Sequence, residues 1–69
     1  MVEIFKTNVQ KETDTNYIIA VIQRQFPTYK VNFDLEDCDK ILRVEGPQLE
    51  PKNIIDYVNT LGYVCVVLE

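Results

Sequence analysis

The sequence predicts a single α+β domain in which a four-stranded antiparallel sheet carries two helices on one face. The chain has 69 residues, which is enough for one domain at most. Stretches in which apolar and polar residues alternate are separated by two stretches with helical spacing of the apolar residues. Turn-forming residues stand at the borders. The expected order is therefore strand, helix, strand, strand, helix, strand.

Residues 1–7 are expected to form the first strand, because they hold the β-prone residues Val2, Ile4 and Phe5. A polar loop over residues 8–13 follows. The sequence TDTN offers side chains that can cap the first helix: Thr13, Asp14 and Thr15. The apolar residues of this helix recur at helical spacing: Ile18, Ile19, Ile22 and Phe26, with Val21 at the margin. Pro27 ends the helix, because the residue before a proline avoids the α region.

The middle of the chain predicts a β-hairpin. The stretch YKVNFDL has one apolar face, made of Tyr29, Val31, Phe33 and Leu35. The stretch KILRVEG places its residues on two faces: Leu42 and Val44 on one, and Ile41 and Arg43 on the other. The acidic sequence EDCD between the two stretches is short enough to be the turn of the hairpin.

The stretch LEPKNIIDYVNTLG has the features of a second helix, after a break at Gly46 and Pro47. Pro51 lies in its first turn, where a missing N–H costs little, and Gly62 suits the position after its end. Its apolar stripe consists of Ile54, Ile55, Val58 and Leu61. YVCVVLE then closes the chain as a strand. Right-handed crossovers select the ferredoxin-like split βαβ arrangement for this order.

The net charge of −4 and the lack of histidine narrow the possible functions. The seven Lys and Arg residues are scattered, whereas nucleic acid and anionic lipid need clustered positive charge. The chain has no His, which is the usual general base and a common zinc ligand. We therefore expect no enzyme, no nucleic acid partner and no membrane partner. Without an apolar span or a secretory signal, we expect a cytoplasmic protein with reduced Cys38 and Cys65.

The carboxyl-terminal half resembles the corresponding half of heavy-metal-associated domains, the copper-chaperone-like modules that occur alone or at the front of metal-transporting ATPases. The shared features are a strand ending in VEG, a proline that opens the second helix, the pattern II…V…LGY, and a final strand after GY. The resemblance implies one such domain over residues 1–69. It also implies that a metal site would lie in the loop between the first strand and the first helix, where the family has Met-x-Cys-x-x-Cys.

This loop holds no cysteine in the present chain. By layout Val9 falls near the methionine position, and Lys11 and Asp14 fall near the two cysteine positions. None of these residues supplies the soft sulfur that Cu(I) prefers. We interpret the chain as a heavy-metal-associated-like domain that lacks the cysteine pair, needs no cofactor and acts as a protein-interaction module.

An alternative interpretation is a soft-metal (copper or zinc) carrier that uses Cys38 and Cys65, with Lys11 or Tyr63 as outer groups. Both cysteines fall toward the end of the sheet where the family binds metal. Cys38 shares its odd–even parity with Leu42 and Val44 but sits at the end of the hairpin, among acidic residues. However, one strand separates the two cysteine-bearing segments by two spacings of about 4.8 Å each. The acidic run DLEDCD does not have the spacing of a calcium-binding loop, so we expect it to be a solvated hairpin tip.

The last strand indicates a surface for a partner. Val64, Val66 and Leu68 share the face opposite Cys65, and Ile41 lies on the outer face of its own strand. If Cys65 faces the helices, these residues lie on the open face of the sheet. Apolar residues on an edge strand are typical of association, with a second copy or with another protein. The alternative is that they are scattered surface aliphatics, which are common.

Overall fold

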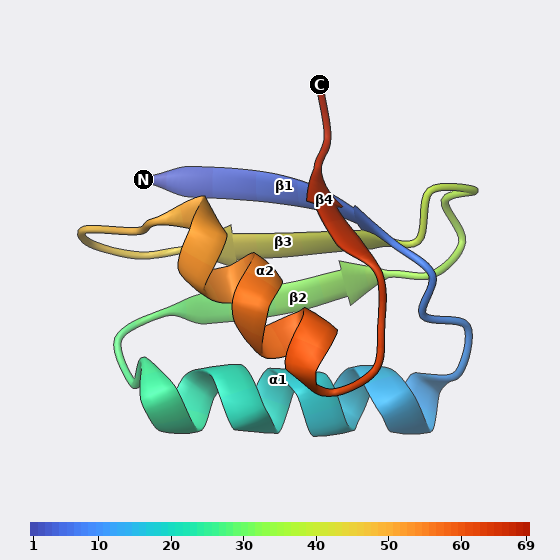
Figure 1. The fold of residues 1–69 in the computed structure, drawn as a ribbon, viewed down its shortest axis with the longest axis horizontal. Helices are drawn as coiled ribbons and strands as arrows, with labels where there is room; N and C mark the ends of the chain where they lie inside the picture. The colour runs from blue at the N-terminus through green and yellow to red at the C-terminus, as the bar shows by residue number, and fades with distance from the viewer.

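The structure is a computed structural model that describes all 69 residues, and it has the predicted order of elements (Figure 1). The elements are β1 (Val2–Thr7), α1 (Glu12–Gln25), β2 (Lys30–Asp34), β3 (Ile41–Glu45), α2 (Pro51–Thr60) and β4 (Cys65–Val67). The strands form one antiparallel sheet in the order β2-β3-β1-β4. This is the ferredoxin-like βαββαβ fold, as predicted. Neither helix is long and apolar enough to cross a membrane.

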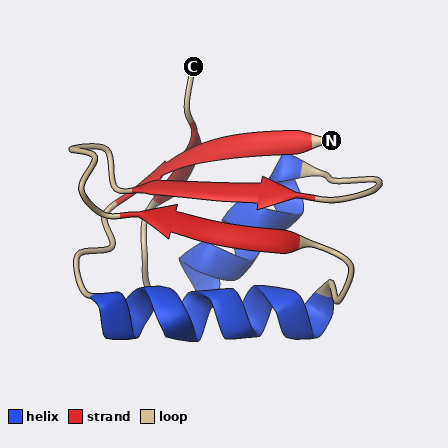
Figure 2. Ribbon diagram, turned by 180° about the vertical axis from the view of Figure 1, so that it is seen from behind, coloured by secondary structure: helices blue, strands red, loops and turns tan.

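The helices pack against one face of the sheet. Figure 2 shows the molecule from the side opposite to Figure 1, and in this view the strands lie in front of α2. The predicted alternation in the strands is confirmed, because the residues facing the helices are buried. In the central strand, Phe5 pairs with Leu42 on one side and with Val67 on the other. The buried apolar core contains Phe5, Val9, Ile18, Ile22, Tyr29, Val31, Leu42, Val44, Leu49, Ile54, Val58 and Cys65.

The start of α1 differs from the prediction of a cap within TDTN. The helix begins at Glu12, and its N-cap is Lys11, which makes no side-chain cap hydrogen bond. The Thr15 hydroxyl donates instead to the Glu12 carbonyl at 2.7 Å, within the helix. The burial of Val9 accounts for the early start, because the chain must turn toward the core before it reaches the expected caps. Glu12 and Asp14 in the first turn still place negative charge at the helix N-terminus, where the helix dipole favours it.

The second helix ends before Gly62, as predicted, whereas the last strand is shorter than expected. Gly62 has a φ of 99°, which a glycine adopts without strain, and its N–H donates to the Asn59 carbonyl at 2.9 Å. The strand β4 begins only at Cys65. One residue earlier, the N–H of Val64 donates to the side-chain oxygen of Asn8 at 2.9 Å instead of to a main-chain carbonyl. The side chain thus replaces the ladder at the start of β4.

Aromatic rings close the opposite end of the core. Tyr29 stacks on Phe26 with ring centroids 4.7 Å apart, and Phe26 makes an edge contact with Tyr57 at 5.7 Å. Gly46, directly after β3, lies under the Tyr29 ring. A Cβ atom at Gly46 would be 2.1 Å from the Cδ1 atom of Tyr29. This position therefore needs glycine for space.

We expect Gly46→Ala to lower the free energy of unfolding by about 1–3 kcal/mol, because the added methyl must displace the Tyr29 ring. Urea unfolding of both proteins measures the difference. The matched control is the same substitution in a Tyr29→Ala background, where the ring is absent and the penalty should fall. An equal penalty in both backgrounds would show that the ring contact is not its cause.

Candidate functional site

Three connections meet at the end of β1: the β1–α1 loop, the β2–β3 hairpin tip, and the α2–β4 turn (Figure 1). Hydrogen bonds join them. The N–H of Thr7 donates to the Asp39 carbonyl at 3.1 Å, and its hydroxyl donates to the Lys40 carbonyl at 2.6 Å. Asn8 accepts from the N–H of Val64 at 2.9 Å. The loop in which the resemblance places a metal site is thus tied on one side to the hairpin and on the other to the start of β4.

The three loop positions at which the resemblance places the metal-binding motif hold side chains of another kind. Val9 is fully buried, and its N–H donates to the Thr7 hydroxyl at 3.2 Å. Lys11 is exposed at the helix cap, whereas Asp14 is half-buried in the first turn. Partial burial and the Asp14 carboxylate raise the pKa of Tyr63, in the α2–β4 turn, above its ordinary value of 10.0. These positions offer an aliphatic core residue, an ammonium group and a carboxylate, and no sulfur.

Cys65 lies opposite Thr7 in the pairing of β4 with β1, on the side of the sheet that faces the helices. Its side chain is 2% exposed, and it forms no disulfide. Burial raises the pKa of the Cys65 thiol to about 12. Because the thiolate is the form that binds metal and attacks electrophiles, this thiol is chemically inactive at neutral pH.

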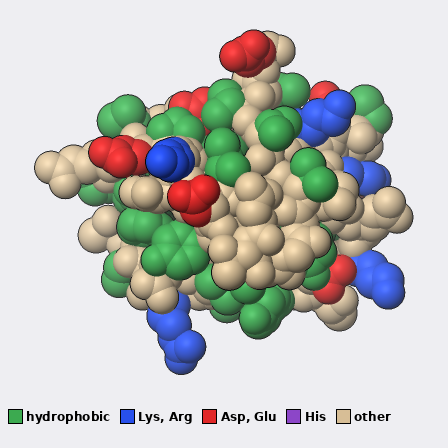
Figure 3. Space-filling view, viewed as in Figure 1, with side chains coloured by type: hydrophobic (Ala, Val, Ile, Leu, Met, Phe, Trp, Pro, Cys, Tyr) green, Lys and Arg blue, Asp and Glu red, His purple; other side chains and the backbone are tan.

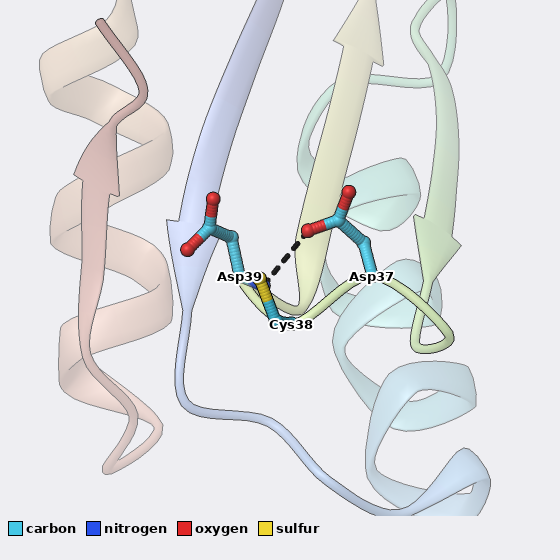
Figure 4. Close-up of side chains that lie close together, drawn as sticks. All are labelled: Asp37, Cys38 and Asp39. Atoms are coloured by element: carbon cyan, nitrogen blue, oxygen red, sulfur yellow. Dashed lines mark hydrogen bonds between the residues drawn. The ribbon is translucent and has the colours of Figure 1, made fainter.

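Cys38 lies at the exposed tip of the hairpin, between Asp37 and Asp39 (Figure 4). One potential ligand atom from each of these three residues lies within 4.8 Å of the others. The carboxylates already have partners, because Asp37 accepts from the N–H of Asp39 at 2.8 Å and Asp39 lies 3.6 Å from the ammonium of Lys6. The cluster therefore forms a turn with an exposed ion pair.

Cys38 lies in the turn of the hairpin, outside both strands, as expected. The strand β3 starts only at Ile41, and Lys40 before it has a φ of 48°, so the alternation does not extend into the tip. One thiol thus lies at the exposed hairpin tip and the other lies in the core. The strand β1 stands between the strands that lead to them.

The open face of the sheet carries a group of aliphatic side chains along β1, β4 and the start of β3, which we call the aliphatic strip. Its predicted members are on this face: Val64, Val66 and Leu68 are 55%, 49% and 38% exposed, and Ile41 is half-buried. The structure adds Ile4, whose carbonyl accepts from the N–H of Leu68 at 2.9 Å, and Val2. The signal for both is their odd–even parity relative to Phe5.

Lys6 interrupts the aliphatic strip. In the pairing scheme it lies between Val66 on β4 and Ile41 on β3, and its ammonium lies 3.6 Å from Asp39. The rest of the open face is polar. This polar half consists of Lys30, Asn32 and Asp34 on β2 and Arg43 and Glu45 on β3, and Arg43 lies 3.6 Å from Glu45. Apart from Ile41, the strip is thus confined to β1 and β4.

No protein-family model matches the chain, and no curated protein sequence matches it. The two candidate sites are therefore identified from the geometry of the structure alone. One is the acidic hairpin tip with Cys38, and the other is the aliphatic strip. The first lacks a second soft ligand beside it, because Cys65 is buried.

Raising the pH above 9 is expected to destabilise the protein through Cys65. The thiol ionises near 9.0 in the unfolded chain but only near 12 in the folded one, so the unfolded state loses its proton first. The contribution of the protonated thiol to the free energy of unfolding is therefore fully present below pH 9 and is lost as the pH rises toward 12. The free energy of unfolding falls by at most about 1.4 kcal/mol per pH unit in this range. Urea unfolding at a series of pH values above 8 measures this slope.

Cys65→Val should reduce the loss of stability at alkaline pH, because valine has a similar volume and no proton to lose. Cys38→Ser is the matched control, since it removes an exposed thiol and should keep the wild-type slope. Ionisation of lysines and tyrosines is common to all three proteins. An unchanged slope in Cys65→Val would show that the buried thiol does not cause the effect.

Proposed function

We propose that this chain is a non-enzymatic protein-interaction domain of the heavy-metal-associated type that has lost the metal-binding cysteine pair. Its binding surface is the aliphatic strip. The observation that supports this function is the exposure of Val64, Val66 and Leu68 side by side with the half-buried Ile4 on the uncovered face of the sheet. Burying such side chains against a partner yields about 25 cal/mol for each Å² removed from water.

The remaining surface gives no support to catalysis or to nucleic acid binding. The buried thiol of Cys65 stays protonated at neutral pH, and the chain has no His to activate the exposed thiol of Cys38. Acidic and basic side chains are interspersed on the face that carries α2, without a basic patch (Figure 3). Free thiols fit a reducing compartment, so we place the protein in the cytoplasm.

Self-association through the aliphatic strip is the first test. We expect the mass measured by equilibrium sedimentation to rise above 8.1 kDa as the concentration reaches the high micromolar range. Val66→Lys should shift this rise to at least tenfold higher concentration, because it places a charge in the centre of the strip. A wild-type protein that stays monomeric throughout would contradict self-association through the strip.

Asn32→Lys is the matched control for this test. Asn32 is exposed on the same open face, on β2 and outside the strip, and the substitution adds the same charge. It should associate like the wild-type protein. If both lysine variants weaken association equally, the effect comes from net charge and the strip is not the binding surface.

A soft-metal carrier is the second candidate function, and the observation that favours it is the exposed Cys38 thiol beside the Asp37 and Asp39 carboxylates. We expect Cu(I) titration against a competing chelator to show no tight one-to-one site, because Cys65 is buried and protonated. A tight site that is lost in both Cys38→Ser and Cys65→Ser would establish the carrier function instead.

A further inference from the structure

We propose that the occupant of the aliphatic strip is a second copy of this chain, joined through the free edge of β4. The two β4 strands pair antiparallel about a two-fold axis at Val66, and the two sheets become one. This inference rests on the proposed interaction function and adds to it the partner and the geometry of pairing.

The main chain of β4 has one unused side. The strand β4 has β1 on one side and no strand on the other. The N–H groups of Val64 and Leu68 point toward β1, where they donate to Asn8 and Ile4. Because main-chain groups alternate in direction along an antiparallel strand, those of Cys65 and Val67 point to the free edge. Such a row of donors and acceptors is satisfied by pairing with another strand.

One register matches these groups with their counterparts in a second copy. Pairing Cys65 with Val67 of the second copy, and the reverse, places Val66 opposite itself and Val64 opposite Leu68. Every cross-strand pair is then apolar, and the exposed side chains of the two strips lie together on one face. The same strand therefore supplies both sides of the contact, as a two-fold interface requires.

Charge favours this edge over the other edge of the sheet. The opposite edge strand, β2, presents Lys30, Asn32 and Asp34 on the open face, and charged residues of this kind block edge pairing. The segment from Val64 to Leu68 has no charged residue and no proline. The nearest cation, Lys6, is paired with Asp39 and would lie about 14 Å from its counterpart, three strand spacings away.

Edge pairing also fits the open face better than face-to-face stacking of two sheets. Stacking whole open faces would bury the polar half of each sheet, including the charges of Lys30 and Arg43. Taking charged groups out of water is costly. Edge pairing leaves this half in water and brings only the side chains of the two strips into contact with one another.

Cysteine cross-linking tests the register. Both variants carry Cys38→Ser and are oxidised with diamide, one with Val66→Cys and the other with Val64→Cys. In the proposed register residue 66 faces itself at a Cα separation of about 4.5 Å, within reach of a disulfide, whereas the two copies of residue 64 lie about 13 Å apart. We expect Val66→Cys to form a covalent dimer at least tenfold faster.

Amide hydrogen exchange of the wild-type protein provides a second measurement that needs no substitution. The amides of Cys65 and Val67 should exchange at least tenfold more slowly at millimolar than at micromolar concentration, while those of β2 should not change. Association without this protection, or with equal cross-linking at both positions, overturns the edge pairing and leaves the proposed function in place. A protein that is monomeric and does not cross-link overturns the second copy as the occupant of the strip.

Discussion

The helices cover only one face of the sheet, and this one-sided cover determines what each strand position can hold. On the covered face, Phe5, Leu42 and Cys65 are removed from water. On the other face the same strands carry Lys6 and Val66 in the solvent. Because strand side chains alternate, a shift of one residue would exchange the two sets. The raised pKa of the Cys65 thiol and the exposure of the aliphatic strip are thus two consequences of one register.

The same register closes the end of the sheet at which the resemblance to heavy-metal-associated domains places a metal site. The hydroxyl of Thr7 donates to the Lys40 carbonyl and accepts from the N–H of Val9, so one side chain joins the hairpin to the β1–α1 loop. Val9 then fills the core, which stabilises the fold by about 1.5–3 kcal/mol relative to an exposed valine. A loop that is tied and buried in this way contributes to the stability of the fold.

Local patterns in the sequence were enough to predict the fold, the hairpin and the orientation of β4. The alternation of apolar residues and the residues Pro27, Pro51 and Gly62 determine the structure of only the few residues around them. They were not enough for features that depend on distant parts of the chain. Val9 and Leu49 lie in connections, where no periodicity signals their burial, and the early start of α1 follows from the first of them. The place of Ile4 beside Leu68 depends on the register of β1 with β4, which no local pattern encodes.

The aliphatic strip is not a requirement of the fold. The strand β2 occupies the other edge of the same sheet and carries Lys30, Asn32 and Asp34 outward, so the open face tolerates polar residues at an edge. Strand propensity does not require valine either, because threonine is also β-branched and would expose less apolar surface. The inner side of β4 already supplies its share of the core through Cys65 and the half-buried Val67. Nothing within the domain therefore accounts for the outward valines, whereas the proposed contact with a second copy would account for them.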